Sequence, residues 1–307
     1  MKGAAMKVRK NTLIKESLPD RISMAIIYTL LTLVLIAVAY PLIYIVSSSF
    51  SSSTAVMEGR VWLLPVQPTL NGYHAVFQYP QIWNGYLNSI IYTALGSLIS
   101  ISLTVMMAYP LSRTTFVGRK LLVWALLFAM LFSGGLIPFY LVVRSLHMLD
   151  TIWAMVLPGA LSVFSVIVAK TFFQSTIPND LYEAAQLDGC NDGRYLISIV
   201  LPLSKPVLAV LLLWSAVGQW NSYFNALILL DSEKMYPLQL VLREILVLNS
   251  VSLGSMSLSA EQLKQFEDMK NLLKYSVIVV ASVPILMLYP FIQKYFVKGV
   301  MIGSIKA

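Results

Sequence analysis

Charged residues are scarce in this chain. Only 12% of its 307 residues are Asp, Glu, Lys or Arg, whereas 58% are hydrophobic and the mean hydropathy is +0.75. Soluble domains carry charge at about 25% of their positions, and disordered chains are poor in apolar residues. The composition therefore excludes both classes and predicts a membrane protein.

Residues that bind metals or nucleotides are also nearly absent. The single cysteine, Cys190, excludes an internal disulfide framework and a multi-cysteine metal site. His74 and His147 lie far apart in the sequence, so we expect no metal site. The sequence contains no G-x-x-x-x-G-K-[ST] loop that would hold nucleotide phosphates. We expect no cofactor in this chain, and any energy from ATP would have to come through a partner.

Long stretches without charge define the predicted spans. A transmembrane helix needs about 20 apolar residues. Six apolar stretches lie between charged residues, at positions 24–46, 86–112, 121–143, 151–169, 206–230 and 275–293. The sequence thus predicts an all-α polytopic membrane protein with six transmembrane helices.

These spans divide the chain into consecutive parts. A basic tail (1–23) is followed by the first transmembrane helix (24–48), an extracytoplasmic loop (49–85), a five-helix core (86–293) and a C-terminal tail (294–307). The core contains two larger soluble segments, a cytoplasmic loop at 177–202 and an extracytoplasmic loop at 231–271.

Lysine and arginine are unevenly distributed between the two sides of the membrane. Fifteen of the 22 lie in the two tails and in the loops on the same side as the tails. Short cytoplasmic loops collect Lys and Arg, so both termini are predicted to be cytoplasmic. Because topology explains most of the net charge of +8, we expect membrane lipid and no nucleic acid as a partner.

Carboxylates are absent from all six predicted spans. Proton- and sodium-coupled carriers commonly use intramembrane carboxylates as relays or ion ligands, so this absence argues against a secondary transporter. We also find no combination of acid, base and nucleophile that suggests a membrane enzyme. A secondary transporter stays open as the less favoured alternative.

The cytoplasmic loop has the pattern of two short helices. Pro178 precedes a helix start, and Asp180 with Glu183 has the spacing of a capping box. Gly189 is placed to end this helix in a left-handed conformation.

A second helix is predicted from residue 191 or 192 through 199, ending at Pro202. Ala184 and Ala185 on the first helix are small, so a partner could pack closely against their surface.

The same loop carries a family motif. Glu183-Ala184-Ala185, Gly189 and Ile199-Val200-Leu201-Pro202 resemble the pattern EAA-x3-G-x9-I-x-L-P of ABC importer permeases. In that family the loop forms coupling helices that dock into a cleft of the ATPase subunit. The resemblance assigns this role to Glu183, Ala184, Ala185, Asp188, Gly189, Leu201 and Pro202. Cys190 departs from the usual Ala, but it is also a small residue.

Most of the chain, from about residue 24 to 307, resembles MalG-type permeases of the CUT1 group, most closely the LplC/YtcP subgroup. The strings at 133–138, 219–225 and 296–303 carry this resemblance. It implies a type I ABC importer permease in a bacterial plasma membrane that takes up oligosaccharides. It also implies a MalF-like second permease, a solute-binding lipoprotein and two ATPase subunits, with the MsmX type as a candidate, that hold ATP and Mg. An ABC permease for another solute is the alternative.

Candidate substrate-path residues lie on the predicted fifth span and at a glycine pair. They are Gln219, Trp220, Asn221, Tyr223, Asn225, Gly134 and Gly135. Residues 219 and 223 are four apart, as are 221 and 225, so each pair is expected to share one helical face. Amides and aromatic rings suit a neutral sugar, although Arg or Lys of the partner permease could bind an acidic one. The alternative is that these side chains only join helices through hydrogen bonds, and that the glycines serve packing.

Two further roles are implied by the resemblance alone. The C-terminal tail would insert between the ATPase subunits, with Lys298, Gly299, Gly303 and Ser304 as contacts; a plain basic anchor is the alternative. The loop at 231–271 would reach the binding protein, or else form an amphipathic cap through Leu258, Leu263, Phe266, Met269 and Leu273.

Overall fold

The computed structural model describes residues 17–245, 273–287, 290 and 293, and these contain helices and turns but no strand. The helices are α1 (Leu18–Ser49), α2 (Ser53–Met57), α3 (Asn71–Gln78), α4 (Pro80–Ser112), α5 (Arg119–Leu131), α6 (Leu136–Ser145), α7 (Ile152–Val156), α8 (Val163–Thr176), α9 (Asn179–Leu187), α10 (Asp192–Tyr195), α11 (Leu201–Leu203), α12 (Lys205–Trp220), α13 (Tyr223–Leu229) and α14 (Leu238–Arg243). A π-helical turn, η1 (Leu196–Val200), joins α10 to α11, and a 3-10 turn, η2 (Glu233–Met235), precedes α14. A last helix covers Leu273–Met287.

Several predicted features lie outside the described residues. They are most of the basic N-terminal tail, the predicted amphipathic positions up to Met269, and Lys298, Gly299, Gly303 and Ser304 of the C-terminal tail.

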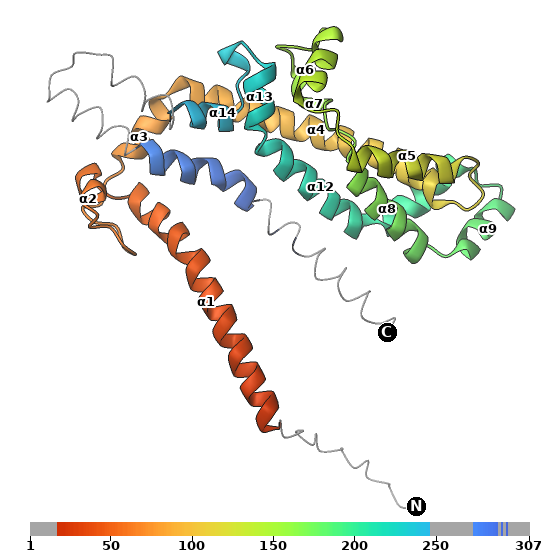
Figure 1. Cartoon of the computed structure of the whole chain (residues 1–307), viewed down its shortest axis with the longest axis horizontal. Helices are drawn as coiled ribbons and strands as arrows, with labels where there is room; N and C mark the ends of the chain where they lie inside the picture. Colours follow the sequence, from red (N-terminus) through yellow and green to blue (C-terminus); the bar gives the residue numbers. More distant parts are fainter. Residues whose placement is uncertain (1–16, 246–272, 288–289, 291–292, 294–307) are drawn as a thin grey trace, which may run out of the picture.

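Helix α1 extends away from the other helices (Figure 1). It begins at a capping box in which Ser17 and Asp20 each bond the backbone of the other. Its most apolar 18-residue window is fully exposed in the single chain, and only Ser47, Ser48 and Ser49 at its end are buried. Such an all-round apolar surface is compatible with lipid or another apolar helix, not with water.

Helix α4 is the centre of the bundle. It packs against α12 and α8 along its C-terminal half and against α7 and α14 toward its start (Figure 1). One core cluster joins Ala108 and Leu111 of α4 to Val166 of α8 and Leu211 of α12.

The predicted spans are more broken than the sequence suggests. Among the described residues, only α1 and α4 are single helices long and apolar enough to cross a membrane. Two bent pairs could add two more, and α8 and Leu273–Met287 are shorter apolar helices. The prediction of one continuous helix over 121–143 is wrong, because α5 and α6 meet at an angle of 116°. Gly135, with φ of 82°, allows the chain to turn there.

Two other predicted spans also divide. The stretch 151–169 forms α7 and the start of α8, with a turn at Pro158 and Gly159 between them. The stretch 206–230 breaks after Trp220, where Asn221 ends α12 and Ser222 precedes α13. All three breaks fall in apolar stretches, which is why the distribution of charge did not show them.

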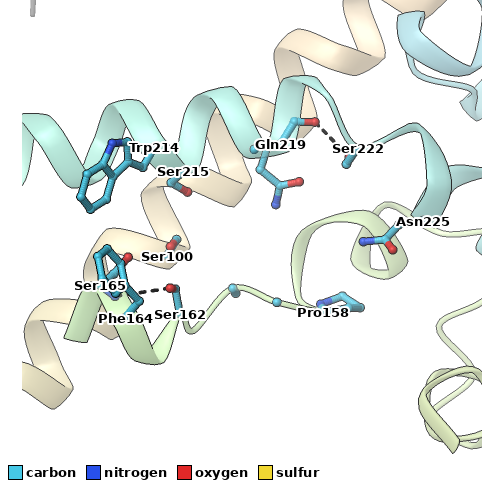
Figure 2. A pocket seen from close by; sticks show the side chains of 13 residues that line it. Ser100, Pro158, Ser162, Phe164, Ser165, Trp214, Ser215, Gln219, Ser222 and Asn225 are labelled. Atoms are coloured by element: carbon cyan, nitrogen blue, oxygen red, sulfur yellow. Dashed lines mark hydrogen bonds between the residues drawn. The ribbon is translucent and has the colours of Figure 1, made fainter. Parts of the chain in front are cut away.

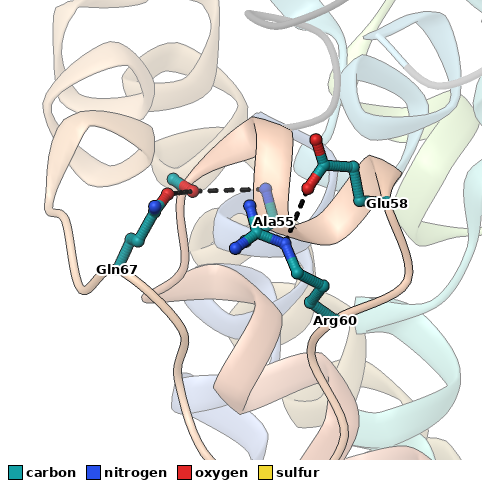
Figure 3. A network of polar contacts seen from close by, with 5 residues as sticks. Ala55, Glu58, Arg60 and Gln67 are labelled. Carbon is teal, nitrogen blue, oxygen red and sulfur yellow. Dashed lines mark hydrogen bonds and ion pairs between the residues drawn. The ribbon is translucent and has the colours of Figure 1, made fainter.

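The loop after α1 is held by short polar contacts (Figure 3). Ser52 accepts a bond from the Ala55 backbone at 3.2 Å and donates to Gln67 at 2.8 Å. Arg60 pairs with Glu58 at 2.6 Å. These contacts hold the loop together internally, and the Ser47 hydroxyl of α1 donates to the carbonyl of Leu63 at 2.6 Å, which holds the loop against the end of α1.

Candidate functional site

The loop between α8 and α12 forms two short helices joined at a glycine turn, as predicted. Gly189 has φ of 77°, its N–H donates to the carbonyl of Gln186 at 3.0 Å, and Cys190 N–H donates to Ala185 at 2.9 Å. This pair of bonds is a Schellman motif that ends α9. The predicted capping box is wrong: α9 starts after Pro178, and no side chain caps it.

The second helix begins where the sequence placed it. Asn191 caps it by accepting a bond from Arg194 N–H at 2.8 Å. It then runs through η1 and past Pro202 to Leu203, one residue beyond the predicted end. The ring of Pro202 clashes with the carbonyl four residues earlier in a regular helix, and the wider π-turn just before it relieves that clash. Leu201 is partly buried, and Pro202 is exposed.

One face of α9 is free of contacts with the rest of the chain that the structure describes. Glu183, Ala184 and Asp188 are exposed, and Leu187 is 90% exposed. Ala185 is buried in the core with α4 and α8, so the expectation that it offers a surface to a partner is wrong. We call Glu183, Ala184, Leu187 and Asp188 the α9 face.

A cation fixes this loop to the end of α4. The guanidinium carbon of Arg113, directly after α4, lies 4.9 Å from the ring centre of Tyr109, 4.7 Å from that of Tyr182 and 4.9 Å from that of Tyr195. These rings come from α4, α9 and α10. Each cation–π contact contributes about 0.5–2 kcal/mol. The four residues form what we call the Arg113 cage.

Asp192 completes the cage. Its Oδ1 accepts bonds from the hydroxyls of Tyr109 at 3.2 Å and Tyr182 at 2.9 Å. The bond to Asp192 raises the pKa of Tyr182, because ionising the phenol would lose it. Tyr195 is fully buried, and its hydroxyl finds no partner within the described residues. Sequence reasoning counted Arg113 only as a topology signal, because its three rings come from three separate segments.

Six of the seven predicted substrate-path residues line three cavities, and Trp220 lines none of them. The first, of about 440 Å³, lies between α12, α4 and the loop before α8. In Figure 2, Gln219 of α12 and Asn225 of α13 extend into the space that faces the Pro158 loop. Hydroxyls of Ser100, Ser162, Ser165, Ser215 and Ser222 also line it. We call it the amide cavity.

Gly96 of α4 allows Gln219 to take this position. A Cβ at residue 96 would lie 2.3 Å from Nε2 and 2.8 Å from Cδ of Gln219. Glycine is therefore required for the present position of the amide, a role that no sequence pattern indicated.

A second cavity of about 510 Å³ adjoins the first. Gly134 and Gly135 line it together with Asn225, Pro158 and Gly159. The two cavities share Pro158, Gly159 and Asn225, so the glycine pair does lie beside the amide cavity.

Asn221 and Tyr223 belong to a third cavity, of about 550 Å³. The expectation that residues 219 and 223, and 221 and 225, stack on one helix is wrong, because α12 ends at Trp220. Trp220 lines none of these three cavities; it is 4% exposed and donates its indole N–H to the carbonyl of Ala281 at 3.2 Å. Its surroundings indicate packing against the last helix.

Asp150 ties two predicted extracytoplasmic segments together. Its Oδ1 accepts bonds from the backbone N–H of Asp231 at 3.1 Å and of Ser232 at 2.9 Å, and Oδ2 accepts from the Ser232 hydroxyl. Together these hydrogen bonds hold the pKa of the Asp150 carboxyl below its usual value, and the bond from the Ser232 hydroxyl has the largest effect.

Comparison with known sequences gives long matches. The sequence profile described as "Binding-protein-dependent transport system inner membrane component" matches residues 100–302. The polygalacturonan/rhamnogalacturonan transport system permease protein YtcP of Bacillus subtilis is 39% identical over 94% of this chain and 99% of its own length. Protein LplC of the same species is 40% identical over 87% of this chain and 88% of its own.

Solved structures give a similar result. A chain of a bacterial ABC transporter involved in the import of the acidic polysaccharide alginate superposes with a TM-score of 0.83 at 36% identity, covering 92% of this chain and 99% of that one. A chain of an alginate ABC transporter in complex with a pentasaccharide-bound periplasmic protein has a TM-score of 0.54 at 16% identity, covering 90% and 95%, and shows likeness of fold alone.

Proposed function

The chain belongs to the inner-membrane components of binding-protein-dependent transport systems, the permeases of ABC importers, and from that premise we propose that it conducts oligosaccharides inward while partner subunits hydrolyse the ATP. The observation that carries the proposal is the α9 face: an exposed Leu and two carboxylates on a helix that the Arg113 cage fixes to α4.

We further propose six membrane crossings with both termini in the cytoplasm. The six would be α1, α4, α5 with α6, α7 with α8, α12 with α13, and Leu273–Met287. The three pairs would be spans broken within the membrane. Broken spans are common in transporters, where the free backbone groups line a cavity. The excess of Lys and Arg on one side supports the orientation.

The partners follow from this arrangement. A second permease would cover the exposed apolar helices, two ATPase subunits would dock on the α9 face and its counterpart, and an extracytoplasmic binding protein would deliver the sugar. The description of the matching family as a component of binding-protein-dependent transport systems supports the last of these. The chain itself has no phosphate-binding loop, so ATP and Mg would be held by the ATPase subunits.

The cargo is assigned from chemistry and relatives together. The amide cavity presents hydroxyls and carboxamides, which can both donate and accept bonds from sugar hydroxyls. YtcP and the alginate transporter are named for polysaccharide import. Both observations favour an oligosaccharide over an amino acid or a phosphonate.

Substituting Gly189 tests the coupling role. A side chain at φ of 77° strains the backbone by about 1–2 kcal/mol, while no described neighbour lies within 4 Å of a new Cβ. We expect Gly189→Ala to insert and assemble but to hydrolyse ATP with little sugar uptake in proteoliposomes. Gly59→Ala is the matched control, since Gly59 has φ of 68° and similar open surroundings and is predicted to lie on the opposite side of the membrane.

Two results would reject the proposal. Normal uptake per ATP in Gly189→Ala would remove the coupling role from this turn. Uptake that continues without ATP would instead favour a secondary transporter.

A further inference from the structure

Helix α14 is held rigidly against α4. A Cβ at Gly85 of α4 would lie 3.0 Å from Cα of Leu238, so the two backbones are in close contact. Ser89 accepts a bond from Leu238 N–H at 2.8 Å. Leu238, Val241 and Leu242 of α14 are all buried. These contacts fix both the position and the rotation of α14.

The other side of α14 carries two polar residues. Gln239 and Arg243 are four apart, so their side chains lie on the same face, and both are partly exposed. They line the 550 Å³ cavity together with Asn221, Tyr223 and Ser282. The volume is within the range of about 300–1,000 Å³ that is usual for small-ligand sites. We call it the Arg243 cavity.

Arg243 gives this cavity a positive charge. None of the described residues that line it is Asp or Glu, and Arg243 makes no ion pair with any of the described residues. The neighbouring carboxyl, Glu244, does not line the cavity and forms no ion pair with Arg243 within the described residues. The two cavities around Gln219 and Asn225 are lined by no charged residue.

We propose that the Arg243 cavity is a carboxylate subsite and that the sugar taken up is therefore acidic, a uronate-containing oligosaccharide. Arg243 holds the carboxylate through paired N–H bonds, a geometry that guanidinium favours over ammonium. Gln239 and Asn221 form hydrogen bonds with ring hydroxyls, and the Tyr223 ring covers an apolar face of the sugar. Asn221 uses its Oδ1, because its amide nitrogen already donates to the carbonyl of Val217. This inference rests on the proposed function. It places the cation that binds an acidic sugar on this chain, whereas the sequence analysis assigned such a cation to the partner permease.

The test compares two sugars of equal length in proteoliposomes that hold the complete transporter. One is a trimer of galacturonic acid, and the other is its carboxyl-reduced form, the matching galactose trimer. We expect Arg243→Gln to lower uptake of the acidic trimer about tenfold or more, the usual effect of losing a bond to a charged group, and to change uptake of the neutral trimer less than about twofold. Arg243→Lys, which keeps the charge without the planar fork, should be intermediate.

Arg144→Gln is the matched control. Arg144 is exposed at the end of α6 on the same predicted side and lines none of the three cavities, so its loss should leave the ratio of the two uptakes unchanged. Saturation-transfer NMR on the complex without the binding protein reads the preference of the permease itself. There the acidic trimer should show a signal that Arg243→Gln removes.

The outcomes separate this inference from the proposed function. If wild-type vesicles take up both trimers with ATP but Arg243→Gln lowers both equally or neither, Arg243 has no role in charge recognition and the inference is overturned. If wild-type vesicles take up neither trimer although the complex hydrolyses ATP, the oligosaccharide function fails and the inference falls with it.

Discussion

Arg113 links the end of a membrane helix to the helices that would receive the ATPase. Its charge is shared among three tyrosine rings, and two of those tyrosines donate to Asp192. The cage therefore joins α4, α9 and α10 through a planar cation that a lysine cannot replace.

Replacing Arg113 should uncouple the transporter. We expect Arg113→Ala to lower stability by about 2 kcal/mol, given about 0.5–2 kcal/mol for each cation–π contact, and to lower the number of sugars taken up per ATP hydrolysed. Arg113→Lys should show the same loss of coupling in part. The readouts are the thermal midpoint and the two rates measured in one vesicle preparation.

Tyr195→Phe serves as the control for that experiment. The substitution keeps the ring but removes a buried hydroxyl that has no partner among the described residues. Removing an unpaired polar group costs little or stabilises slightly, so uptake per ATP should stay at the wild-type value. A loss of coupling in Tyr195→Phe equal to that in Arg113→Ala would show that the cation is not what joins the helices.

Gly96 and Gln219 should act as a pair. A methyl group at residue 96 overlaps the Gln219 amide and must move it from its present position. We expect Gly96→Ala and Gln219→Ala each to lower sugar uptake, and the double substitution to be no worse than Gln219→Ala alone, because both remove the same contact. Additive losses in this double-mutant cycle would mean that Gly96 acts through something other than Gln219.

At the scale of helices, the sequence predicts an element well where neighbouring residues alone determine it. The left-handed Gly189 and the Asn191 cap act on their immediate neighbours, so spacing alone located the two loop helices. Helix breaks at Ser133–Gly135, Pro158–Gly159 and Asn221–Ser222 were missed, because absence of charge predicts burial in a membrane but not continuity.

The residues that line the cavities could be predicted only in part. Gln219 and Asn225 do meet in one cavity, but Asn221 and Tyr223 line another, since the break after Trp220 changes the direction of the chain. Gly96 and Arg243 act through contacts with segments far away in the sequence, and no local pattern contains that information.

The contact between Asp150 and the start of η2 should make the extracytoplasmic side sensitive to acid. The pKa of Asp150 is lowered in the folded state, so its stabilising effect is complete above the usual carboxyl pKa of about 3.9 and is lost as pH falls through the lower folded value. We expect Asp150→Asn to have a lower thermal midpoint than the wild type at pH 7. The difference between the two midpoints should become smaller toward pH 3. A difference that grows on acidification would contradict the assignment.

At the scale of the whole molecule, α4 connects the two functional regions. It carries Ser100 at the amide cavity and ends beside Arg113 in the cage. Thirteen residues of helix separate them, about 20 Å at 1.5 Å per residue. A push on the α9 face can thus reach the cavity through one rigid element, as expected for rigid-body switching between two states.

The location of the α9 face tests this account most directly. Leu187→Cys, made in a Cys190→Ala background, places a single thiol on that face, since Cys190 is the only cysteine of the chain. In inverted membrane vesicles, an impermeant maleimide should label this thiol when the ATPase subunits are stripped away, and a short bifunctional reagent should link it to an ATPase subunit when they are present. Labelling of the thiol from outside intact cells, or ATPase subunits that bind without protecting it, would contradict the account.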